Sequence, residues 1–261
     1  MHIVSLISDF GLQDYYVAEL KARILSQNPS TQFVDVSHQI EPHDIVQAAH
    51  FLENVYAKFP ESTIHVVAVN NYYDEDSKLI CFSYQGHYFI GPDNGVFSLV
   101  FDDFESFTIY TIDEGEENND QLERQIVSAI NKIQKTDSIE GVGQLLPYPQ
   151  IKMGIKPVIT PSQIRATIIH IDHYGNVVIN LKEDQFRQLR KGRGFEIFYS
   201  QFNPITEISS SYKNAGVGDV LCLFNSSGFL EISIYMGNAS ELLNLHRNET
   251  IQINLINSNS D

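Results

Sequence analysis

The N-terminal stretch Ile3-Val4-Ser5-Leu6-Ile7-Ser8-Asp9-Phe10-Gly11 leads an apolar, strand-like run directly into a carboxylate, an aromatic ring and a glycine. A second string of this kind, Ile171-Asp172-His173-Tyr174-Gly175-Asn176, lies far downstream. Carboxylates bind ribose hydroxyls or an ammonium group, aromatic faces stack on a purine, and glycine lets the backbone approach a ligand closely. The two strings together predict a nucleoside-shaped site assembled from two parts of the chain. Alternatively, Asp9 caps the turn that follows it and Asp172 belongs to an ordinary hairpin turn.

Strand and helix patterns alternate along the half of the chain that begins with the first string. Apolar runs predict strands at 3–7, 33–36 and 64–69, and apolar residues at helical spacing predict helices at 14–27, capped by Asp14, and at 44–59. This order predicts right-handed crossovers and a largely parallel sheet. Ligands of such sheets bind at the carboxyl ends of the strands, where Asp9 and Asn70 follow the first and third strands.

The pattern changes after a proline-containing linker at 154–162. Before the linker we expect two further strands, at 87–90 and 107–112, and a third helix marked by Leu122, Ile126 and Ile130. After it come two short helices, at 183–189 and 239–243, and short strands at 166–171, 177–181, 195–199, 220–225, 229–235 and 251–256. Strands at this spacing are typical of a small β-barrel or sandwich. The sequence thus predicts an α/β N-terminal domain with a mostly parallel sheet over residues 1–155, and a smaller β-rich, barrel-like C-terminal domain over residues 163–261.

Charge and composition narrow the class of protein. The 261 residues carry a net charge of −16, and 43% of them are hydrophobic, as in folded globular proteins. Such an acidic surface repels nucleic acid and anionic membranes, so neither is expected as a partner. Cys81 and Cys222 lie in apolar runs, which indicates buried free thiols. The apolar run at the N-terminus is too short for a signal peptide or a membrane span, so we expect a cytoplasmic protein. The acidic stretch 113–120 is expected to be a solvated loop.

Strings found in one known family occur here in the same order. They are Ser8-Asp9-Phe10-Gly11, Val34-Asp35-Val36-Ser37-His38 with Pro42-His43-Asp44-Ile45, Phe59-Pro60-Glu61-Ser62-Thr63-Ile64-His65, Gly91-Pro92-Asp93-Asn94-Gly95, Ile171-Asp172-His173-Tyr174-Gly175-Asn176 and Asn225-Ser226-Ser227-Gly228-Phe229-Leu230-Glu231-Ile232. On these strings the chain resembles the S-adenosyl-L-methionine hydroxide adenosyltransferase family, relatives of the bacterial fluorinases and chlorinases. The resemblance implies an α/β N-terminal domain, a β-rich C-terminal domain and a homotrimer. It also implies that the ligand lies between the N-terminal domain of one subunit and the C-terminal domain of the next.

The same resemblance implies that the ligand is S-adenosyl-L-methionine or adenosine, and it gives each matching residue a role. Asp9 would bind the 2′ and 3′ hydroxyls of the ribose, with Phe10 beside it. Tyr174 would stack on adenine, Asn176 would read the polar edge of the base, and Asp172 would bind the methionine ammonium. The pocket would be completed by Ser226, Glu231 and the backbone from Ile234 to Met236. A carboxylate can accept from two hydroxyls, and an amide can both donate to and accept from adenine, so the residue types suit these roles.

The residues that activate water in this family are replaced here. Its hydrolytic members attack C5′ of the ribose with water and expel methionine from an already activated sulfonium, so no metal or other cofactor is expected. They position the water with an Asp–Arg–His set, whose Asp and Arg lie in a string of the form Asp-Pro-Gly-Val-Gly-Thr-x-Arg. This chain has Asn70 in place of the Asp and Ser77 in place of the Arg, and no His lies near Gln121. The serine that serves the halide-using relatives falls near Leu122, which argues against halogenation.

Two hypotheses about function follow from these departures. The first is a rearranged S-adenosyl-L-methionine hydrolase in which Asn70 still orients a water. In that case Asp74, Glu75 or Asp76 supplies a carboxylate and Lys78 a cation, although a solvated loop is the simpler interpretation of this cluster. The second is a non-catalytic protein that binds S-adenosylmethionine or adenosine. An interaction module that uses the trimer surface would bind neither ligand.

Overall fold

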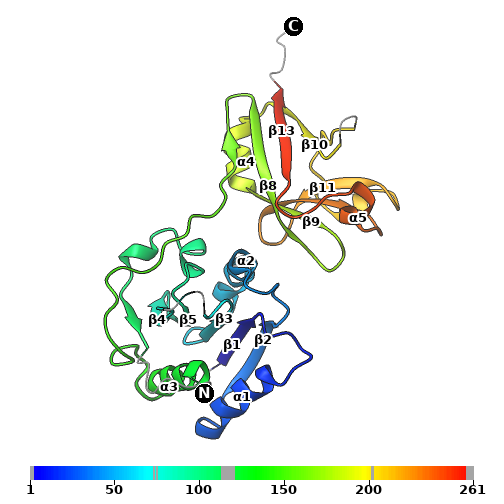
Figure 1. The fold of residues 1–261 in the computed structure, drawn as a ribbon. Coiled ribbons are helices and arrows are strands. Elements are labelled where there is room, and N and C mark those ends of the chain that lie inside the picture. The colour runs from blue at the N-terminus through cyan, green and yellow to red at the C-terminus, as the bar shows by residue number, and fades with distance from the viewer. Residues whose placement is uncertain (1–2, 73, 75, 113–120, 201–202, 257–261) are drawn as a thin grey trace. The chain divides into compact units, whose positions relative to one another are not determined.

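The chain folds into two units, each built on one β-sheet (Figure 1). The computed structural model of the protein describes residues 3–72, 74, 76–112, 121–200 and 203–256. The division between the units falls between Gly154 and Ile155. Within the described residues, no helix is long and apolar enough to cross a membrane. The acidic stretch 113–120, expected to be a loop, lies outside the described residues.

The N-terminal unit is a six-stranded sheet covered by helices. Its strands are β1 (Ile3–Ser8), β2 (Gln32–Ser37), β3 (Ile64–Ala68), β4 (Leu79–Tyr84), β5 (His87–Pro92) and β6 (Ile109–Thr111). Its helices are α1 (Tyr16–Gln27), α2 (Ile45–Val55) and α3 (Gln121–Thr136), with short 3₁₀ turns at Tyr56–Lys58, Phe97–Leu99 and Phe104–Ser106. The strand order is β2-β1-β3-β5-β4-β6. The predicted alternation of strands and helices is therefore present.

The prediction of a mostly parallel sheet is only partly right. β1 pairs in parallel with β2 and β3, and β3 pairs in parallel with β5, but β4 runs antiparallel to both β5 and β6. The reason is a two-residue hairpin turn between β4 and β5. Gln85 (φ 48°) and Gly86 (φ 78°) both have left-handed backbones, the combination that a type I′ turn requires. The apolar run at Leu79–Phe82 is thus a strand that the sequence analysis did not identify.

Two separate apolar cores cover the faces of this sheet. On β1 alternate side chains face opposite sides, so Leu6 packs with Leu20 and Ile24 of α1. α3 covers the same face as α1 (Figure 1). The neighbouring side chain, Ile7, packs in the other core with Leu52 of α2. With both faces covered, the carboxyl ends of β1 and β3 remain as the edge at which a ligand can bind.

The C-terminal unit is a curled antiparallel sheet that does not close. Its strands are β7 (Val158–Ile159), β8 (Gln163–Ile171), β9 (Val177–Lys182), β10 (Gly194–Phe198), β11 (Val220–Phe224), β12 (Phe229–Ile234) and β13 (Thr250–Ile256). Its helices are α4 (Glu183–Arg190) and α5 (Ala239–Leu243), with a 3₁₀ turn at Tyr212–Asn214. The strand order is β10-β13-β8-β9-β12-β11, with β7 added beside β8. Among the described strands the two at the ends, β10 and β11, do not pair with each other, so the unit is a half-barrel.

Local predictions had mixed outcomes. The predicted cap at Asp14 is wrong, because α1 begins after Tyr15 and has no side-chain cap. The second helix is capped by Asp44, whose carboxylate accepts from the backbone N–H of Gln47 at 2.9 Å. The predicted burial of Cys81 and Cys222 as free thiols is confirmed, and burial raises the pKa of both.

Candidate functional site

Asp9 ties three chain segments together at the carboxyl end of the N-terminal sheet. Oδ2 of its side chain accepts from the backbone N–H of His43 at 3.0 Å and from that of Asn70 at 3.1 Å. His43 lies just before α2, and Asn70 follows β3. The carboxylate therefore caps two distant turns rather than the turn that follows it. Because one oxygen accepts both bonds, the other keeps its capacity to accept from a ligand.

His43 and Asn70 also contact each other through their side chains. Both residues have left-handed backbones, with φ of 67° and 50°. Nδ1 of His43 lies 3.2 Å from Oδ1 of Asn70. An amide oxygen only accepts, so Nδ1 carries the hydrogen and a neutral ring keeps its lone pair on Nε2. The nitrogen of this exposed imidazole that remains to accept a hydrogen is therefore Nε2.

The turn at Gly91–Gly95 holds the residues that follow β3 in place. Nδ2 of the buried Asn94 donates to the backbone oxygens of Val69 and Asn70, both at 3.0 Å, and its Oδ1 accepts from the N–H of Val96 at 3.1 Å. A buried amide with all of these partners is expensive to remove. This turn therefore holds Asn70 in place.

The residues on either side of Asp9 are anchored to the sheet. Oγ of the buried Ser8 lies 2.7 Å from Nδ1 of His38, and the N–H of Gly11 donates to the backbone oxygen of His38 at 2.7 Å. Phe10 packs against the core on the α1 side and meets Tyr16 edge-to-face at 6.2 Å. These contacts fix the direction in which the Asp9 side chain points.

The second string forms the hairpin loop between β8 and β9. Oδ1 of Asp172 accepts from the N–H groups of Tyr174 and Asn176, both at 2.9 Å, and its Oδ2 accepts from Nδ2 of Asn176 at 2.9 Å. Gly175 has φ of 80°, and a Cβ built on it would lie 2.0 Å from Oδ1 of Asn238. Only glycine fits where the loop packs on the residue that caps α5. The hairpin interpretation is thus right, and it leaves Tyr174 75% exposed.

This loop forms one wall of a pocket of about 720 Å³ in the C-terminal unit. The pocket gathers five residues predicted to bind the ligand, which are Asp172, Tyr174, Asn176, Ile234 and Met236. Met236 has a left-handed backbone (φ 59°) and is 79% exposed, whereas the side chain of Ile234 is buried. The pocket is mostly apolar with a few polar groups, which is the usual lining of a small-molecule site.

Glu231 lies behind this pocket and acts on it through Tyr212. The buried Glu231 carboxylate accepts from the hydroxyls of Tyr212 and Ser233 at 2.7 Å and from Nδ2 of Asn225 at 3.2 Å. The pKa of Tyr212 is raised by burial, by the hydrogen bond to Glu231, and by the charges of Glu231 and Asp172. Ser226 is exposed in the β11–β12 hairpin and is not among the residues that line the pocket.

The acidic segment after β3 forms a turn of its own. Oγ of Ser77 donates to the backbone oxygen of Asp74 at 2.7 Å and accepts from its N–H at 2.9 Å, and Oδ1 of Asp74 accepts from the N–H of Asp76 at 3.0 Å. Lys78 is exposed, and Glu75 lies outside the described residues. Gln121 is the first residue of α3, and Leu122 is buried in the core. No group of three or more His, Cys, Asp or Glu within the described ranges is arranged to hold a metal ion.

Sequence reasoning missed three residues that the structure places at these positions. His43 was part of a matching string, but its contact with Asn70 joins positions 27 residues apart and depends on two left-handed backbones. Tyr212 and Asn238 lie in segments with irregular patterns, so no periodicity pointed to them. A hydrophobic pattern cannot signal contacts of this kind.

Comparisons with known proteins identify the family of the chain. Residues 4–138 match the family model of the SAM hydroxide adenosyltransferase N-terminal domain, and residues 166–252 match that of its C-terminal domain. A Methanocaldococcus jannaschii protein named (R)-S-adenosyl-L-methionine hydrolase is 30% identical over 97% of this chain and 96% of its own length. A fluorinase of Nocardia brasiliensis is 20% identical, over 96% of each chain. A crystal structure of an uncharacterized conserved protein from Thermotoga maritima shares the fold, with a TM-score of 0.82 at 24% identity over 97% of this chain and 99% of its own. The chain therefore belongs to the SAM hydroxide adenosyltransferase family.

Proposed function

We propose that this protein hydrolyses S-adenosyl-L-methionine to adenosine and L-methionine by attack of water at C5′. The observation that carries the proposal is the pocket of about 720 Å³ that brings Asp172, Tyr174 and Asn176 together. The relative in Methanocaldococcus jannaschii that is named a hydrolase of this substrate supports it. In this proposal, residues 1–155 hold the ribose and residues 163–261 hold the base and the amino acid.

The roles follow from the groups that each half-site offers. Asp9 accepts from the 2′ and 3′ hydroxyls of the ribose, since its second oxygen is not used by the bonds to His43 and Asn70. The exposed ring of Tyr174 stacks on adenine. Phe10 supports Asp9 through its packing on the core.

The charge of the pocket in the C-terminal unit suits a cationic ligand. Asp172 lines the pocket, and the buried Glu231 is hydrogen-bonded to the hydroxyls of Tyr212 and Ser233 and to the amide of Asn225, all of them neutral donors. The two carboxylates therefore attract a sulfonium or ammonium group. Asn176 reads the base, and the backbone from Ile234 to Met236 completes the wall. Ser226 keeps its proposed contact with the amino acid, from the hairpin beside β12.

The reaction needs a positioned water and a proton acceptor. A bond forms between the water oxygen and C5′, the bond between C5′ and sulfur breaks, and its electron pair stays on sulfur in neutral methionine. The water loses one proton. His43 is placed to take it, since its Nδ1 is held by Asn70 and its Nε2 is the free acceptor. Asn70 orients this ring, and through it the water. No step in this scheme requires a metal.

A specific observation favours a second candidate, a binding protein without turnover. Ser77, which stands in place of the family arginine, is engaged in the turn with Asp74. Of the described carboxylates of that turn, Asp74 accepts from the N–H of Asp76, and both side chains are exposed. Such a protein keeps the pocket for S-adenosylmethionine or adenosine but lacks a strong means of activating water.

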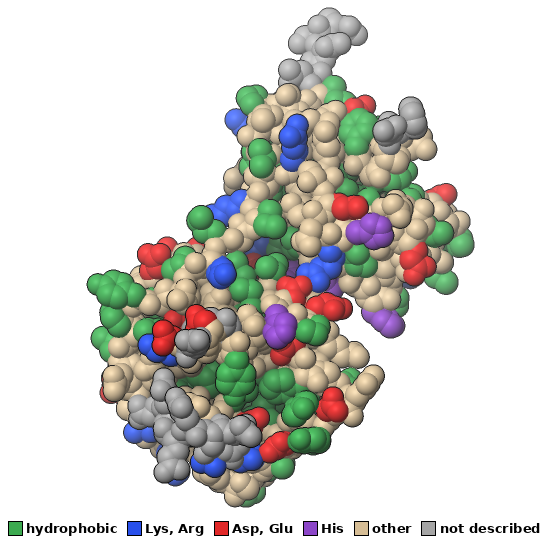
Figure 2. Space-filling model, in the orientation of Figure 1, with side chains coloured by type: hydrophobic (Ala, Val, Ile, Leu, Met, Phe, Trp, Pro, Cys, Tyr) green, Lys and Arg blue, Asp and Glu red, His purple; other side chains and the backbone are tan. Residues whose placement is uncertain are grey.

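We further propose that the working form is a homotrimer in which the Asp9 half-site of one subunit and the Tyr174 half-site of the next enclose the ligand. Exposed apolar side chains support association, because large apolar patches on a surface mark contacts. Several exposed apolar residues lie close in sequence near the end of the N-terminal unit, namely Leu145, Tyr148, Ile151 and Met153. Apolar side chains are exposed at several places on the face drawn in Figure 2.

Calorimetry with S-adenosylmethionine and with adenosine, followed by product analysis, separates the candidates. The hydrolase binds S-adenosylmethionine and releases adenosine well above the spontaneous rate. Binding without release of adenosine supports the binding protein. If neither ligand binds at millimolar concentration, the pocket assignment is wrong. Running both sulfonium diastereomers separately tests which one the site accepts, since relatives are named for the R form.

A further inference from the structure

The turn that contains Asp9 is held at both of its ends by one residue, His38. Nδ1 of the His38 ring lies 2.7 Å from Oγ of Ser8, which precedes Asp9, and the backbone oxygen of His38 accepts from the N–H of Gly11 at 2.7 Å. Oγ of Ser8 also accepts from the N–H of Phe10 at 3.5 Å, so it closes the turn around Asp9. A movement of the His38 ring is therefore transmitted to Asp9.

A bulge in β2 brings His38 to this position. The pairing between β1 and β2 shifts by one residue between Leu6 and Ile7, which leaves Val36 without a partner of its own. Bulges change the direction of nearby side chains and are frequent beside functional sites. His38 follows this bulge by two residues, so the shift in register decides which side chain after β2 meets Ser8.

The other nitrogen of the His38 ring faces a charged pair. Nε2 of His38 lies 3.1 Å from Oδ1 of Asp35, although the two are not aligned as a hydrogen bond. Oδ2 of Asp35 accepts from Nζ of Lys21 on α1 at 2.6 Å. Burial alone would raise the pKa of Asp35, but its contacts with Lys21 and His38 outweigh burial and lower that pKa. A carboxylate beside Nε2 keeps the ring hydrogen on that nitrogen, so Nδ1 accepts from the hydroxyl of Ser8.

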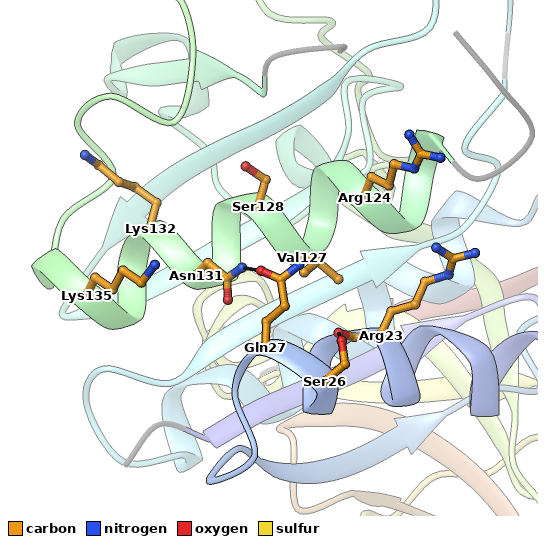
Figure 3. Close-up of a pocket in the computed structure, with 9 residues that line it drawn as sticks. All are labelled: Arg23, Ser26, Gln27, Arg124, Val127, Ser128, Asn131, Lys132 and Lys135. Carbon is orange, nitrogen blue, oxygen red and sulfur yellow. Dashed lines mark hydrogen bonds between the residues drawn. The ribbon is translucent and has the colours of Figure 1, made fainter. Parts of the chain in front are cut away.

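Lys21 can anchor this pair because helix α1 is itself held in place. α1 and α3 lie side by side on one face of the sheet (Figure 3). The side-chain oxygen of Gln27, at the end of α1, accepts from the amide of Asn131 on α3 (Figure 3). A chain of contacts thus runs from α1 through Asp35 to the ring of His38.

We propose that His38, set by Asp35 and acting through Ser8, is a positioning residue that makes the site selective for the hydroxyls of a ribose. This rests on the proposed binding of the 2′ and 3′ hydroxyls by Asp9. His38 and Ser8 are 5% and 2% exposed, so both act from within the fold. A hydrogen bond weakens steeply when its direction changes, so a small shift of Asp9 lowers affinity only for ligands that carry these hydroxyls.

Two serine variants form a matched pair for the test. Ser5 lies on the same strand and makes the same kind of buried bond, with Oγ 2.7 Å from Nδ1 of His65, but it is not part of the Asp9 turn. Calorimetry with adenosine and with 2′-deoxyadenosine gives the preference of each variant for the 2′ hydroxyl. We expect at least a tenfold preference for adenosine in the unaltered protein. This preference should be at least threefold smaller in Ser8→Ala and unchanged in Ser5→Ala. Both variants lose one buried hydrogen bond, so their thermal midpoints should fall by similar amounts.

Variants of His38 and Asp35 separate positioning from packing. His38→Asn keeps an acceptor where Nδ1 lies and should retain the preference for adenosine, whereas His38→Leu removes the acceptor and should reduce the preference as Ser8→Ala does. Asp35→Asn should also reduce the preference, because an amide no longer keeps the ring hydrogen on Nε2. The control Asp102→Asn makes the same change in charge at an exposed position and should leave the preference unchanged.

The outcomes distinguish this role of His38 from the proposed function. If adenosine does not bind, or if the unaltered protein binds both nucleosides equally, the role of Asp9 is wrong and that of His38 falls with it. If the unaltered protein prefers adenosine while Ser8→Ala and His38→Leu keep that preference, positioning by His38 is overturned and the role of Asp9 stands. Equal reductions of the preference in Ser8→Ala and Ser5→Ala would overturn positioning as well, since they would reflect a general loss of stability.

Discussion

At the scale of single residues, the site depends on a few side chains whose backbone partners lie far away in the sequence. Asp9 accepts from two N–H groups in segments 34 and 61 residues distant. Asp172 instead accepts within its own five-residue loop. The contacts of Asp172 could be predicted from the string Ile171–Asn176, because they join residues that are close together in the sequence. The contact between His43 and Asn70 could not, because it depends on the β1–β3 register and on two left-handed backbones.

The proposed base leads to a prediction about rate rather than binding. We expect His43→Gln to lower kcat at least tenfold and to change KM little, because Nε2 takes the proton of the water but holds no part of the ligand. The control His246→Gln, also exposed, should behave as the unaltered enzyme does. Equal kcat values for His43→Gln and the unaltered enzyme would show that another group takes the proton.

The proposed stacking on Tyr174 is testable with a matched pair of variants. Tyr174→Ala removes the ring and should weaken adenosine binding about tenfold or more, as expected for loss of one base–aromatic stack. Tyr174→Phe keeps the ring and should retain the affinity. Because the side chain is 75% exposed, neither change should lower the thermal midpoint much. Calorimetry with adenosine checks both variants, and equal losses of affinity in the two would contradict stacking as the role of this residue.

At the scale of elements, three adjacent strands carry a buried polar cluster that the function does not use. His65 of β3 bonds to Ser5 of β1 at 2.7 Å and lies 3.2 Å from His87 of β5, ring nitrogen to ring nitrogen. His65 is fully buried, and burial together with the neighbouring His87 lowers its pKa from 6.5 to about 3. The folded sheet therefore holds this imidazole in its neutral form.

This cluster makes the stability of the N-terminal unit sensitive to acid. As the pH falls below 6.5, His65 becomes protonated in the unfolded chain. In the folded chain the same ring stays neutral until the pH approaches its lowered pKa of about 3. The free energy of unfolding should therefore fall as the pH drops through this window, by up to about 1.4 kcal/mol per pH unit from this group. His65→Asn removes the titrating ring and should flatten the dependence, at some cost in stability at neutral pH from the smaller side chain. Urea unfolding from pH 7 to pH 4 measures both slopes, with the exposed His246→Asn as control. Parallel curves for His65→Asn and the unaltered protein would refute this account.

The elements themselves could be predicted largely from hydrophobic periodicity. Strands β1, β2, β3 and β5 and helices α2 and α3 lie where apolar patterns put them. Every residue of β3 and β5 is buried, whereas each of the two helices buries one face. β4 was missed because the turn that directs it, Gln85-Gly86, is decided by backbone conformation rather than by apolar spacing. The start of α1 was misplaced because nothing in the apolar pattern marks the residue at which a helix begins.

At the scale of the whole molecule, we expect each site to combine one half-site from one subunit with the other half-site from the next. Asp9→Asn disables the ribose half-site and Asn176→Ala disables the base half-site, so each variant alone should be inactive. If each site joins the first half-site of one subunit to the second half-site of the next, mixed trimers contain sites in which both halves are intact. Random mixing of equal amounts should restore about one quarter of the activity of the unaltered enzyme.

Mixing is done by unfolding and refolding the two variants together, with each variant refolded alone as the control. Light scattering gives the mass of the assembly in the same samples. Restored activity requires sites shared between subunits. If the mixture stays as inactive as its components while the protein is trimeric, each site is built from one chain. A monomeric mass would contradict the proposed trimer but would not bear on the proposed hydrolysis.

The most direct test of the central claim is the fate of solvent oxygen during turnover. The purified protein is incubated with S-adenosyl-L-methionine in water enriched in oxygen-18, and the adenosine formed is analysed by mass spectrometry. Attack of water at C5′ predicts adenosine that carries the heavy isotope at its 5′ hydroxyl, together with an equal amount of methionine. It also predicts that Asn176→Ala abolishes both products. Unlabelled adenosine, or no adenosine above the rate without protein, would contradict the proposed hydrolysis.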